Sequence, residues 1–392
     1  MTNTRGWPVS AAGRSVISGP SPTAPARPAG WQARADSAGW AADFESAGAR
    51  RGVQLALGAI WLLDAALQYQ PHMFSRAFVT QQIDPAAAGS PGFVSGPVTL
   101  AGHVILHSPV AFDALFATIQ LAIGLGLLWR RTARAALAGS IIWALSIWWL
   151  GEGLGGIFTG SASPVTGAPG AAVLYALISV LAWPSGARLL SGGSVASDSR
   201  LGEHWARSAW LVVWGSGAYF LLMASNQAPG ALRGQVTSAA AGEPGWIAGL
   251  DRRAATVIGS HGTEVSLLLA VVFAVIALGV LVPAATRPAL LLAVITAAVI
   301  WLVGESLGGM LTGQGTDPNT GPLLILLAAA YWPLPRASRR PSWPSAAAAS
   351  GRHRGTPVSR HPGGQGNLQN LAGQGSRSRT GPTGVMPDLD RL

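Results

Sequence analysis

The chain has 392 residues, of which 49% are hydrophobic and only 11% are charged. So few charged side chains cannot cover a water-soluble protein of this length, and the composition therefore predicts a membrane protein. The absence of Cys excludes disulfides, thiolate metal ligands and a dithiol relay.

The basic residues indicate which partners to expect. The formal net charge is +10, and all 26 basic side chains are Arg. Most of them lie in the two tails and in short links between apolar runs, and they are not interleaved with aromatic residues. This pattern is typical of a basic cytoplasmic face rather than a nucleic-acid groove. We therefore expect the lipid bilayer and other membrane proteins as partners, and no nucleic acid.

Eight apolar runs follow one another along the chain. Each is near the length that crosses about 30 Å of hydrocarbon as a helix. They cover residues 53–70, 111–129, 133–151, a fourth run that ends near 184, 208–223, 264–282, 288–304 and 321–332. Continuous apolar runs without alternation predict helices, because lipid offers no hydrogen bonds to a bare backbone.

One stretch occurs twice. Residues 147–160 read IWWLGEGLGGIFTG and residues 300–313 read IWLVGESLGGMLTG, with nine of fourteen positions identical. Glu152 and Glu305 occupy equivalent places, 153 positions apart. This duplication predicts an all-α polytopic membrane protein of about eight transmembrane helices, built as two tandem four-helix repeats in the same orientation.

Composition divides the chain into five expected parts. They are a disordered N-terminal tail (1–50), a first membrane repeat (51–186), a cytoplasmic linker (187–207), a second membrane repeat (208–335) and a disordered basic C-terminal tail (336–392). Each repeat has a long connection after its first run, in which we expect a helix along the membrane surface. In the second connection, Trp246 and Ile247 fall on the apolar face of that helix and Asp251 falls on the polar face.

The short links also predict the topology. With eight spans, the Arg clusters all fall on one side: 50–51, 130–134, 188–207, 287 and 336–340. The loops 152–169 and 305–320 lack Arg and fall on the other side. The positive-inside rule then predicts a multi-pass protein of the cell membrane, with both termini in the cytoplasm and both glutamates at the outer surface.

Two stretches of the first repeat resemble the DoxX-like family of small four-helix membrane proteins. Residues 51–63 read RGVQLALGAIWLL, which is similar to the first helix of that family. Residues 120–134, QLAIGLGLLWRRTAR, are similar to its second helix and tight basic turn, although Gln120 stands where the family often has an acid. The resemblance covers residues 51–150 and, more faintly, 208–335. It implies a tandemly duplicated bundle with an accessory role in the membrane, which in some members is associated with thiol redox or respiratory chains.

Glu152 and Glu305 are the main candidate site residues. Each ends an apolar run, where an ionised carboxylate costs less than at the middle of a bilayer. With the glycines that follow, they predict a polar pocket at the outer face that binds a cation, a proton or a quinone head group. These glycines are Gly155, Gly156, Gly308 and Gly309. The alternative is that each glutamate binds backbone amides of the next turn, which the glycines permit.

Three further residues are candidates for the same pocket: His107, His261 and Asp64. Each histidine precedes a span that has an acid near its start, Asp113 or Glu264, and histidine with carboxylates can bind zinc or copper. The alternative is a neutral histidine at the membrane interface. For Asp64, a structural hydrogen bond or an ion pair with Arg76 is the simpler interpretation.

Two classes of function remain open on this sequence. The leading interpretation is a binding or accessory component of a membrane process. The alternative is a transporter or channel for a small solute or ion through the interface between the repeats. An enzyme would need His107 and Glu152 to converge, and the sequence identifies neither a catalytic motif nor a cofactor. Whether His107, Asp64 and Glu152 meet in one cavity is the most informative structural question.

Overall fold

The computed structural model describes residues 29–184 and 193–334, with side chains described from residue 47 onward. The chain divides into two units, Met1–Ser338 and Arg339–Leu392, and the described residues all belong to the first. Within them there are helices and loops but no strand, so the predicted all-α class is confirmed. Three expected segments lie outside the described residues: positions 1–28 of the first tail, 187–192 of the linker and the tail 336–392.

Residues 29–184 form the following elements: α1 (Ala29–Leu67), α2 (Arg76–Phe78), the π-helix η1 (Val79–Ile83), α3 (Asp84–Ala87), α4 (Gly92–Leu106), α5 (Pro109–Leu128), α6 (Ala133–Leu150), η2 (Gly153–Gly156), η3 (Pro164–Thr166) and α7 (Ala171–Leu181). We call this part the first half.

Residues 193–334, the second half, form a similar series: α8 (Gly202–Leu221), α9 (Ala224–Gln227), α10 (Ala231–Ala239), α11 (Gly245–Ile258), α12 (Gly262–Gly279), α13 (Thr286–Val299), the π-helix η4 (Ile300–Gly304), η5 (Ser306–Gly309) and α14 (Thr320–Tyr331). The expected helix is present in each long connection, as α4 and as α11.

Four helices in the described residues are long and apolar enough to cross a membrane: α5, α6, α12 and the continuous segment Thr286–Gly304. The helices α7 and α14 have only 11 and 12 residues. At 1.5 Å per residue they rise less than 20 Å, roughly two thirds of a hydrocarbon core. Both follow loops rich in Gly and Pro, which delay the start of the helix.

Two helices begin earlier than the apolar pattern predicts. Helix α1 begins at Ala29 instead of near residue 53, so positions 29–50 of the expected tail are helical. The stretch from Ala29 to Gln70 contains no Pro, and its polar part is rich in Ala, so nothing interrupts the helix before its apolar run. Helix α8 likewise begins at Gly202, inside the expected linker.

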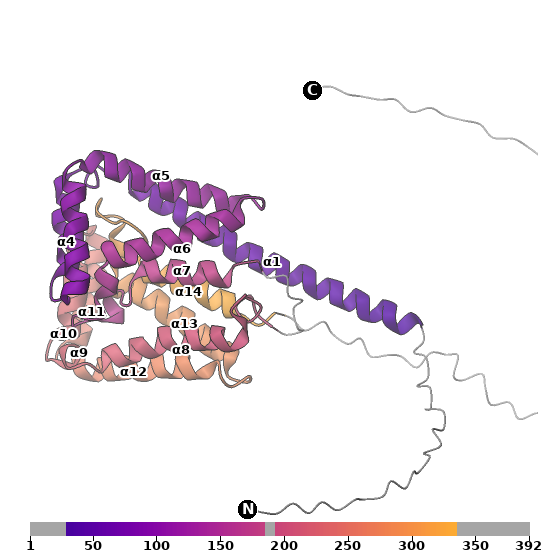
Figure 1. Ribbon diagram of the computed structural model, residues 1–392. Helices are drawn as coiled ribbons and strands as arrows, with labels where there is room; N and C mark the ends of the chain where they lie inside the picture. The colour runs from indigo at the N-terminus through magenta and orange to yellow at the C-terminus, as the bar shows by residue number, and fades with distance from the viewer. Residues whose placement is uncertain (1–28, 185–192, 335–392) are drawn as a thin grey trace, which may run out of the picture. The chain divides into compact units, whose positions relative to one another are not determined.

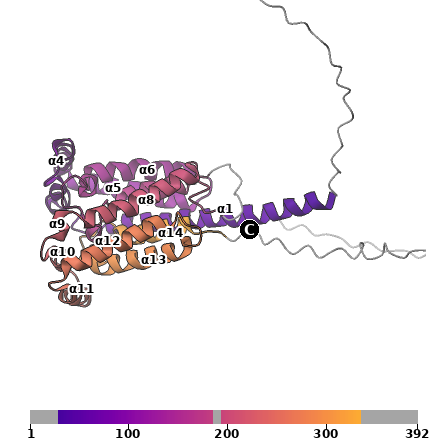
Figure 2. The ribbon, with the colours of Figure 1, turned by 90° about the horizontal axis from the view of Figure 1, so that it is seen from below.

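The helices of the apolar runs lie side by side, and the helices of the two long connections lie at one end of them. In both ribbon views α4, α9, α10 and α11 lie at this end (Figures 1 and 2). Helix α4 contacts η2 and α11 contacts η5, which places both Gly-Glu motifs there. We call this the glutamate end. Helix α7 contacts α14, which joins the two halves along their length.

Buried tryptophans form the centre of each half. Trp61 donates a hydrogen bond to Ser140 at 2.9 Å, and Trp210 donates one to the carbonyl of Ile276 at 3.0 Å. Both rings stack near a tyrosine, Tyr175 at 4.4 Å and Tyr331 at 4.8 Å between ring centroids. Because their N–H groups have partners, these large rings are buried without leaving a donor unsatisfied.

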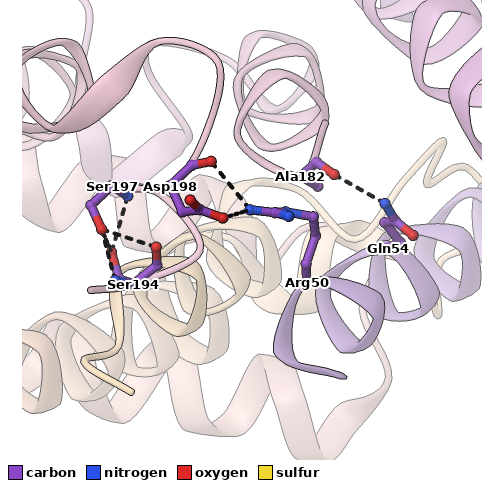
Figure 3. A network of polar contacts seen from close by, with 6 residues as sticks. All are labelled: Arg50, Gln54, Ala182, Ser194, Ser197 and Asp198. Atoms are coloured by element: carbon purple, nitrogen blue, oxygen red, sulfur yellow. Dashed lines mark hydrogen bonds and ion pairs between the residues drawn. The ribbon is translucent and has the colours of Figure 1, made fainter. Parts of the chain in front are cut away.

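At the opposite end, an ion pair attaches α1 to the segment that joins the halves. The guanidinium of Arg50 pairs with the carboxylate of Asp198 and also donates to its backbone carbonyl at 3.2 Å (Figure 3). One turn further along α1, Gln54 donates to the carbonyl of Ala182 at 3.0 Å. Both contacts are at least part-buried, so they fix α1 against the end of α7 and the following segment.

Candidate binding site

The two Gly-Glu motifs adopt the same unusual backbone. Residues 153–156 and 306–309 all have positive φ angles. Among them, Leu154 and Leu307 have φ of 57° each. An L-residue in this left-handed region is disfavoured by roughly 1–2 kcal/mol, so the surrounding structure holds both turns in place.

The glycines of these turns permit close approach as well as left-handed backbone. A Cβ atom on Gly155 would lie 1.8 Å from the carbonyl oxygen of Pro169, and one on Gly308 would lie 2.6 Å from the carbonyl carbon of Pro318. Each turn is therefore pressed against the loop that follows it. This geometry accounts for the first glycine of each Gly-Gly pair.

Each glutamate reaches across to the start of the next helix. Glu152 accepts a hydrogen bond from the backbone N–H of Ala172, at 3.0 Å. Glu305 accepts one from the N–H of Gly321, also at 3.0 Å, and another from the hydroxyl of Thr320. Carboxylates at these positions satisfy free N–H groups at the N-termini of α7 and α14.

The two glutamates differ in what remains free. Both oxygens of Glu305 have partners and its side chain is buried, whereas Oε2 of Glu152 is buried without a partner. Burial, together with the charge of Asp317, raises the pKa of Glu152 to about 8, against the hydrogen bond from Ala172 that lowers it. Burial also raises the pKa of Glu305 to about 7, against the hydrogen bonds from Thr320 and Gly321. Glu152 therefore has the capacity to bind a ligand or a proton, beyond closing a turn.

A cavity of about 910 Å³ lies between these motifs at the glutamate end. We call it the end cavity. It is lined by both glutamates, by all four candidate glycines and by Asp317 and Glu243. The loops of the two halves meet beside it, where a Cβ on Gly167 would lie 2.6 Å from the side-chain oxygen of Asn319.

A second cavity, of about 1090 Å³, lies inside the first half. We call it the side cavity. Its walls come from α1, the α2–η1–α3 segment, α4, α5, α6, α7 and the loop before α14, and most of the lining residues are apolar or aromatic. It adjoins the end cavity, with which it shares seven lining residues: Gln82, Pro85, Ala86, Glu152, Thr166, Thr316 and Asp317. The two cavities therefore meet beside Glu152 and Asp317.

Several buried polar groups of the side cavity lack a protein partner. Tyr175 donates a hydrogen bond to Oδ2 of Asp64 at 2.6 Å, but Oδ1 of Asp64 is unpartnered. The side-chain oxygens of Gln68 and Gln120 are unpartnered too. These three residues line the cavity, and their exposed fractions are only 1%, 4% and 4%. Buried polar atoms normally have partners, so this set indicates that the cavity holds water or a ligand with a polar group.

The charge in both cavities has one sign. The side cavity is lined by Asp64, Glu152 and Asp317, and among the described residues neither cavity is lined by Arg or His. No group of three or more His, Asp or Glu in the described part of the chain has the geometry of a metal site.

The side cavity reaches the molecular surface between apolar side chains. Four large apolar side chains of its lining are exposed: Leu100 and Val104 on α4, Leu115 on α5 and Leu150 on α6. Helices α5 and α6 are two of the helices suited to crossing a membrane. An opening framed by exposed leucine and valine on such helices faces hydrocarbon if they span a bilayer.

The second half lacks this polar lining. Gly217 and Phe273 stand 153 positions after Asp64 and Gln120. The Phe273 ring is buried, lies 5.1 Å from that of Trp214, and would be 2.4 Å from a Cβ on Gly217. Phenylalanine therefore fills the region of the second half where the first half has a carboxyl and an amide.

The structure brings together some of the predicted site residues and not others. Glu152 and Glu305 share the end cavity, and Asp64 lies in the adjoining side cavity, bonded to Tyr175 rather than to Arg76. His107 and His261 are exposed and line neither cavity. His107 lies four positions after His103 on α4, and its Nδ1 is 2.7 Å from the carbonyl oxygen of His103.

Sequence reasoning missed Asp317 and misplaced Asp251. Asp317 holds its own turn, accepting bonds from the hydroxyl of Thr316 and the N–H of Asn319. The signal for it was an acid before Pro318, where the first half has Ser163 before Pro164. Asp251, expected on the polar face of α11, is fully buried and accepts a hydrogen bond from the hydroxyl of Ser306 at 2.6 Å.

Comparison with known proteins adds nothing to this geometry. No protein-family model matches the chain, and no curated protein or solved structure is significantly similar to it.

Proposed function

We propose that the protein spans the cell membrane eight times, as two tandem four-helix repeats in the same orientation. In this arrangement α1, α7, α8 and α14 cross together with the four longer apolar helices, and the glutamate end faces outward. Support comes from the 153-residue offset of the motifs and from their matched left-handed turns. Kinship with DoxX-like proteins is part of this proposal and rests on residues 51–63 and 120–134 alone.

We propose further that the first half binds an amphiphilic cation in the side cavity. The observation that supports this is the combination of three acids, aromatic walls and no basic residue in the described lining. A cation would neutralise a buried carboxylate, and rings such as those of Trp61 and Trp143 attract positive charge through their faces. The apolar remainder of the wall suits hydrophobic groups attached to that charge.

The opening between α4, α5 and α6 suggests how such a molecule enters. An amphiphile partitions into the bilayer and meets the exposed Leu100, Leu115 and Leu150 there. Its charged group then exchanges the membrane interface for the carboxyls of the cavity. Binding from the bilayer fits a binding or accessory component of a membrane process.

The test uses the full chain in lipid nanodiscs, with radiolabelled tetraphenylphosphonium as the cationic probe and triphenylphosphine oxide as its neutral analogue. We expect saturable binding of the cation and much weaker binding of the neutral molecule. Asp64→Asn should weaken binding at least tenfold. Asp113→Asn is the matched control, because Asp113 is a buried acid on α5 that lines neither cavity. Equal binding of both probes, or equal loss in both variants, contradicts the proposal.

Transport is the second candidate function, and the junction of the two cavities favours it. A solute that enters the side cavity from the bilayer has a path past Glu152 and Asp317 into the end cavity, which both halves line. Proteoliposomes distinguish the two functions. A transporter takes up tetraphenylphosphonium into proteoliposomes faster than protein-free liposomes do, whereas a binding protein adds only the amount that its sites hold.

A further inference from the structure

Three carboxyl groups connect the interior of the first half to the glutamate end. Asp64 lies on α1 inside the side cavity, and Glu152 and Asp317 line both cavities at their junction. Asp317 belongs to the loop before α14, so the second half contributes a charge to the cavity of the first. It interacts electrostatically with Asp64, Glu152 and Glu305.

Two of these carboxyl groups have a buried oxygen without a hydrogen-bond partner. Oδ1 of Asp64 is buried and unbonded, and its side chain is only 1% exposed. Oε2 of Glu152 is likewise buried and unbonded. A buried carboxyl group without a cation beside it is normally neutral, because an isolated ionised carboxylate is very costly to bury. The free oxygens therefore suit groups that hold a proton until something replaces it.

We infer that Asp64, Asp317 and Glu152 form a proton exchange path, in which binding of an amphiphilic cation in the side cavity releases one proton at the glutamate end. This inference rests on the proposed binding function. The inference adds that a proton is exchanged for the cation, and that this proton leaves through the end cavity rather than through the apolar opening.

The step balances in atoms and charge. The O–H bond of the neutral Asp64 carboxyl breaks, its electrons remain on the carboxylate oxygen, and that carboxylate neutralises the entering cation. The proton passes by way of Asp317 and Glu152 to water in the end cavity. The net charge of the site is unchanged, so the dry interior never holds an uncompensated ion.

In the described structure no positively charged side chain lies near Asp64 to neutralise its carboxylate in place of the bound cation. The titratable groups that face it are Tyr175 on α7, Asp317 and Glu152. Other ionisable side chains of the packed helices lie elsewhere: Asp113 on α5 lines neither cavity, His103 on α4 and Arg134 on α6 are exposed, and Arg51 on α1 binds the carbonyls of Leu127 and Leu128.

The groups at the junction hold protons in the range that the exchange needs. Burial raises the pKa of Glu152 to about 8 and raises the pKa of Asp317 as well. The charge of Asp317 disfavours ionisation of Glu152, which favours a protonated Glu152 near neutral pH. A cation that needs the ionised form then binds more tightly as the pH rises and reaches a plateau once the site has lost its proton.

The experiment measures probe binding and proton release together, on the full chain in nanodiscs. Tetraphenylphosphonium is added in weakly buffered solution with a pH-sensitive dye, and its affinity is measured from pH 5 to pH 9. We expect about one proton released per probe bound, and an affinity that rises by up to tenfold per pH unit until the site has lost its proton.

Two variants make the result specific. Asp317→Asn should slow proton release, because Asp64 still loses its proton but one step of the route to the end cavity is missing. Asp113→Asn should behave like the original protein. Binding at constant affinity from pH 5 to 9 without proton release overturns the exchange and leaves the binding function standing. Absence of specific binding at every pH, with an unchanged melting temperature, overturns the binding function itself.

Discussion

The ring of Phe273 lies against the backbone of Gly217, in the second half, at the positions equivalent to Gln120 and Asp64 in the first. A Cβ on Gly217 would lie 2.4 Å from that ring, so the ring fits in this position only against a glycine. In the first half a carboxyl and an amide stand instead, beside a cavity of about 1090 Å³. The two halves therefore differ at this pair: a carboxyl and an amide line a cavity in the first half, and a phenylalanine packs against a glycine in the second.

This relationship predicts how the side cavity can be filled. Gln120→Phe alone should lower the melting temperature, because its ring meets the Asp64 side chain, and overpacking costs roughly 1–3 kcal/mol. Asp64→Gly together with Gln120→Phe should restore much of the loss and abolish tetraphenylphosphonium binding. Thermal melting of both single variants and the double variant measures the coupling. Additive losses would show that the two positions do not meet.

The left-handed turns allow a matched pair of substitutions. Gly155 and Gly156 have φ of 64° and 67°, so Ala at either position should cost roughly 1–2 kcal/mol from the backbone alone. Only Gly155 also meets the carbonyl of Pro169, whereas the nearest atom to a Cβ on Gly156 is 3.8 Å away, on Thr159. Gly155→Ala should therefore lower the melting temperature clearly more than Gly156→Ala. Equal losses would mean that the loop moves aside freely.

Protonation of Glu152 predicts how stability depends on pH. In the native state its pKa is about 8, against 4.5 for an ordinary glutamate, so the native protein holds a proton that the unfolded chain has released. This contribution is fully present below about pH 4.5 and is lost as the pH rises through about 8. The melting temperature in detergent should fall between pH 5 and pH 8.

Glu152→Gln should reduce that fall, since the amide has no proton to lose. The exposed Glu264 offers the control, and Glu264→Gln should leave the pH dependence unchanged. If the Glu152 variant loses stability with pH as steeply as the original protein, the carboxyl is ionised in the native state.

Local patterns and long-range contacts differ in how far the sequence reveals them. The apolar runs predict the helices, and the repeated Gly-Glu motif marks two turns whose residues line one cavity in the structure. The bond between Tyr175 and Asp64 joins residues 111 positions apart, and Asp317 reaches the first half from the end of the second. No periodicity indicates such contacts. Asp251 was misplaced for the same reason, because its partner Ser306 lies on a distant turn.

The last prediction concerns orientation in the membrane. One end of the long helices, with its short links, carries Arg50, Arg51, Arg130, Arg131 and Arg287. The glutamate end has Arg only in its longer connections. Short loops decide topology more than long ones do, so we expect the arginine-rich end to remain in the cytoplasm. The glutamate end, with its end cavity, should then face outward.

Alkaline phosphatase, which is active only outside the cytoplasm, tests this orientation in bacterial cells. A fusion after Leu392 should be inactive, and an insertion at Ser161, in the exposed loop after the first motif, should be active. A matched fusion at Arg131, in the exposed link between α5 and α6, should be inactive because that link lies at the other end. Activity at Leu392 together with inactivity at Ser161 would show the opposite orientation, and the proton released at Glu152 would then enter the cytoplasm.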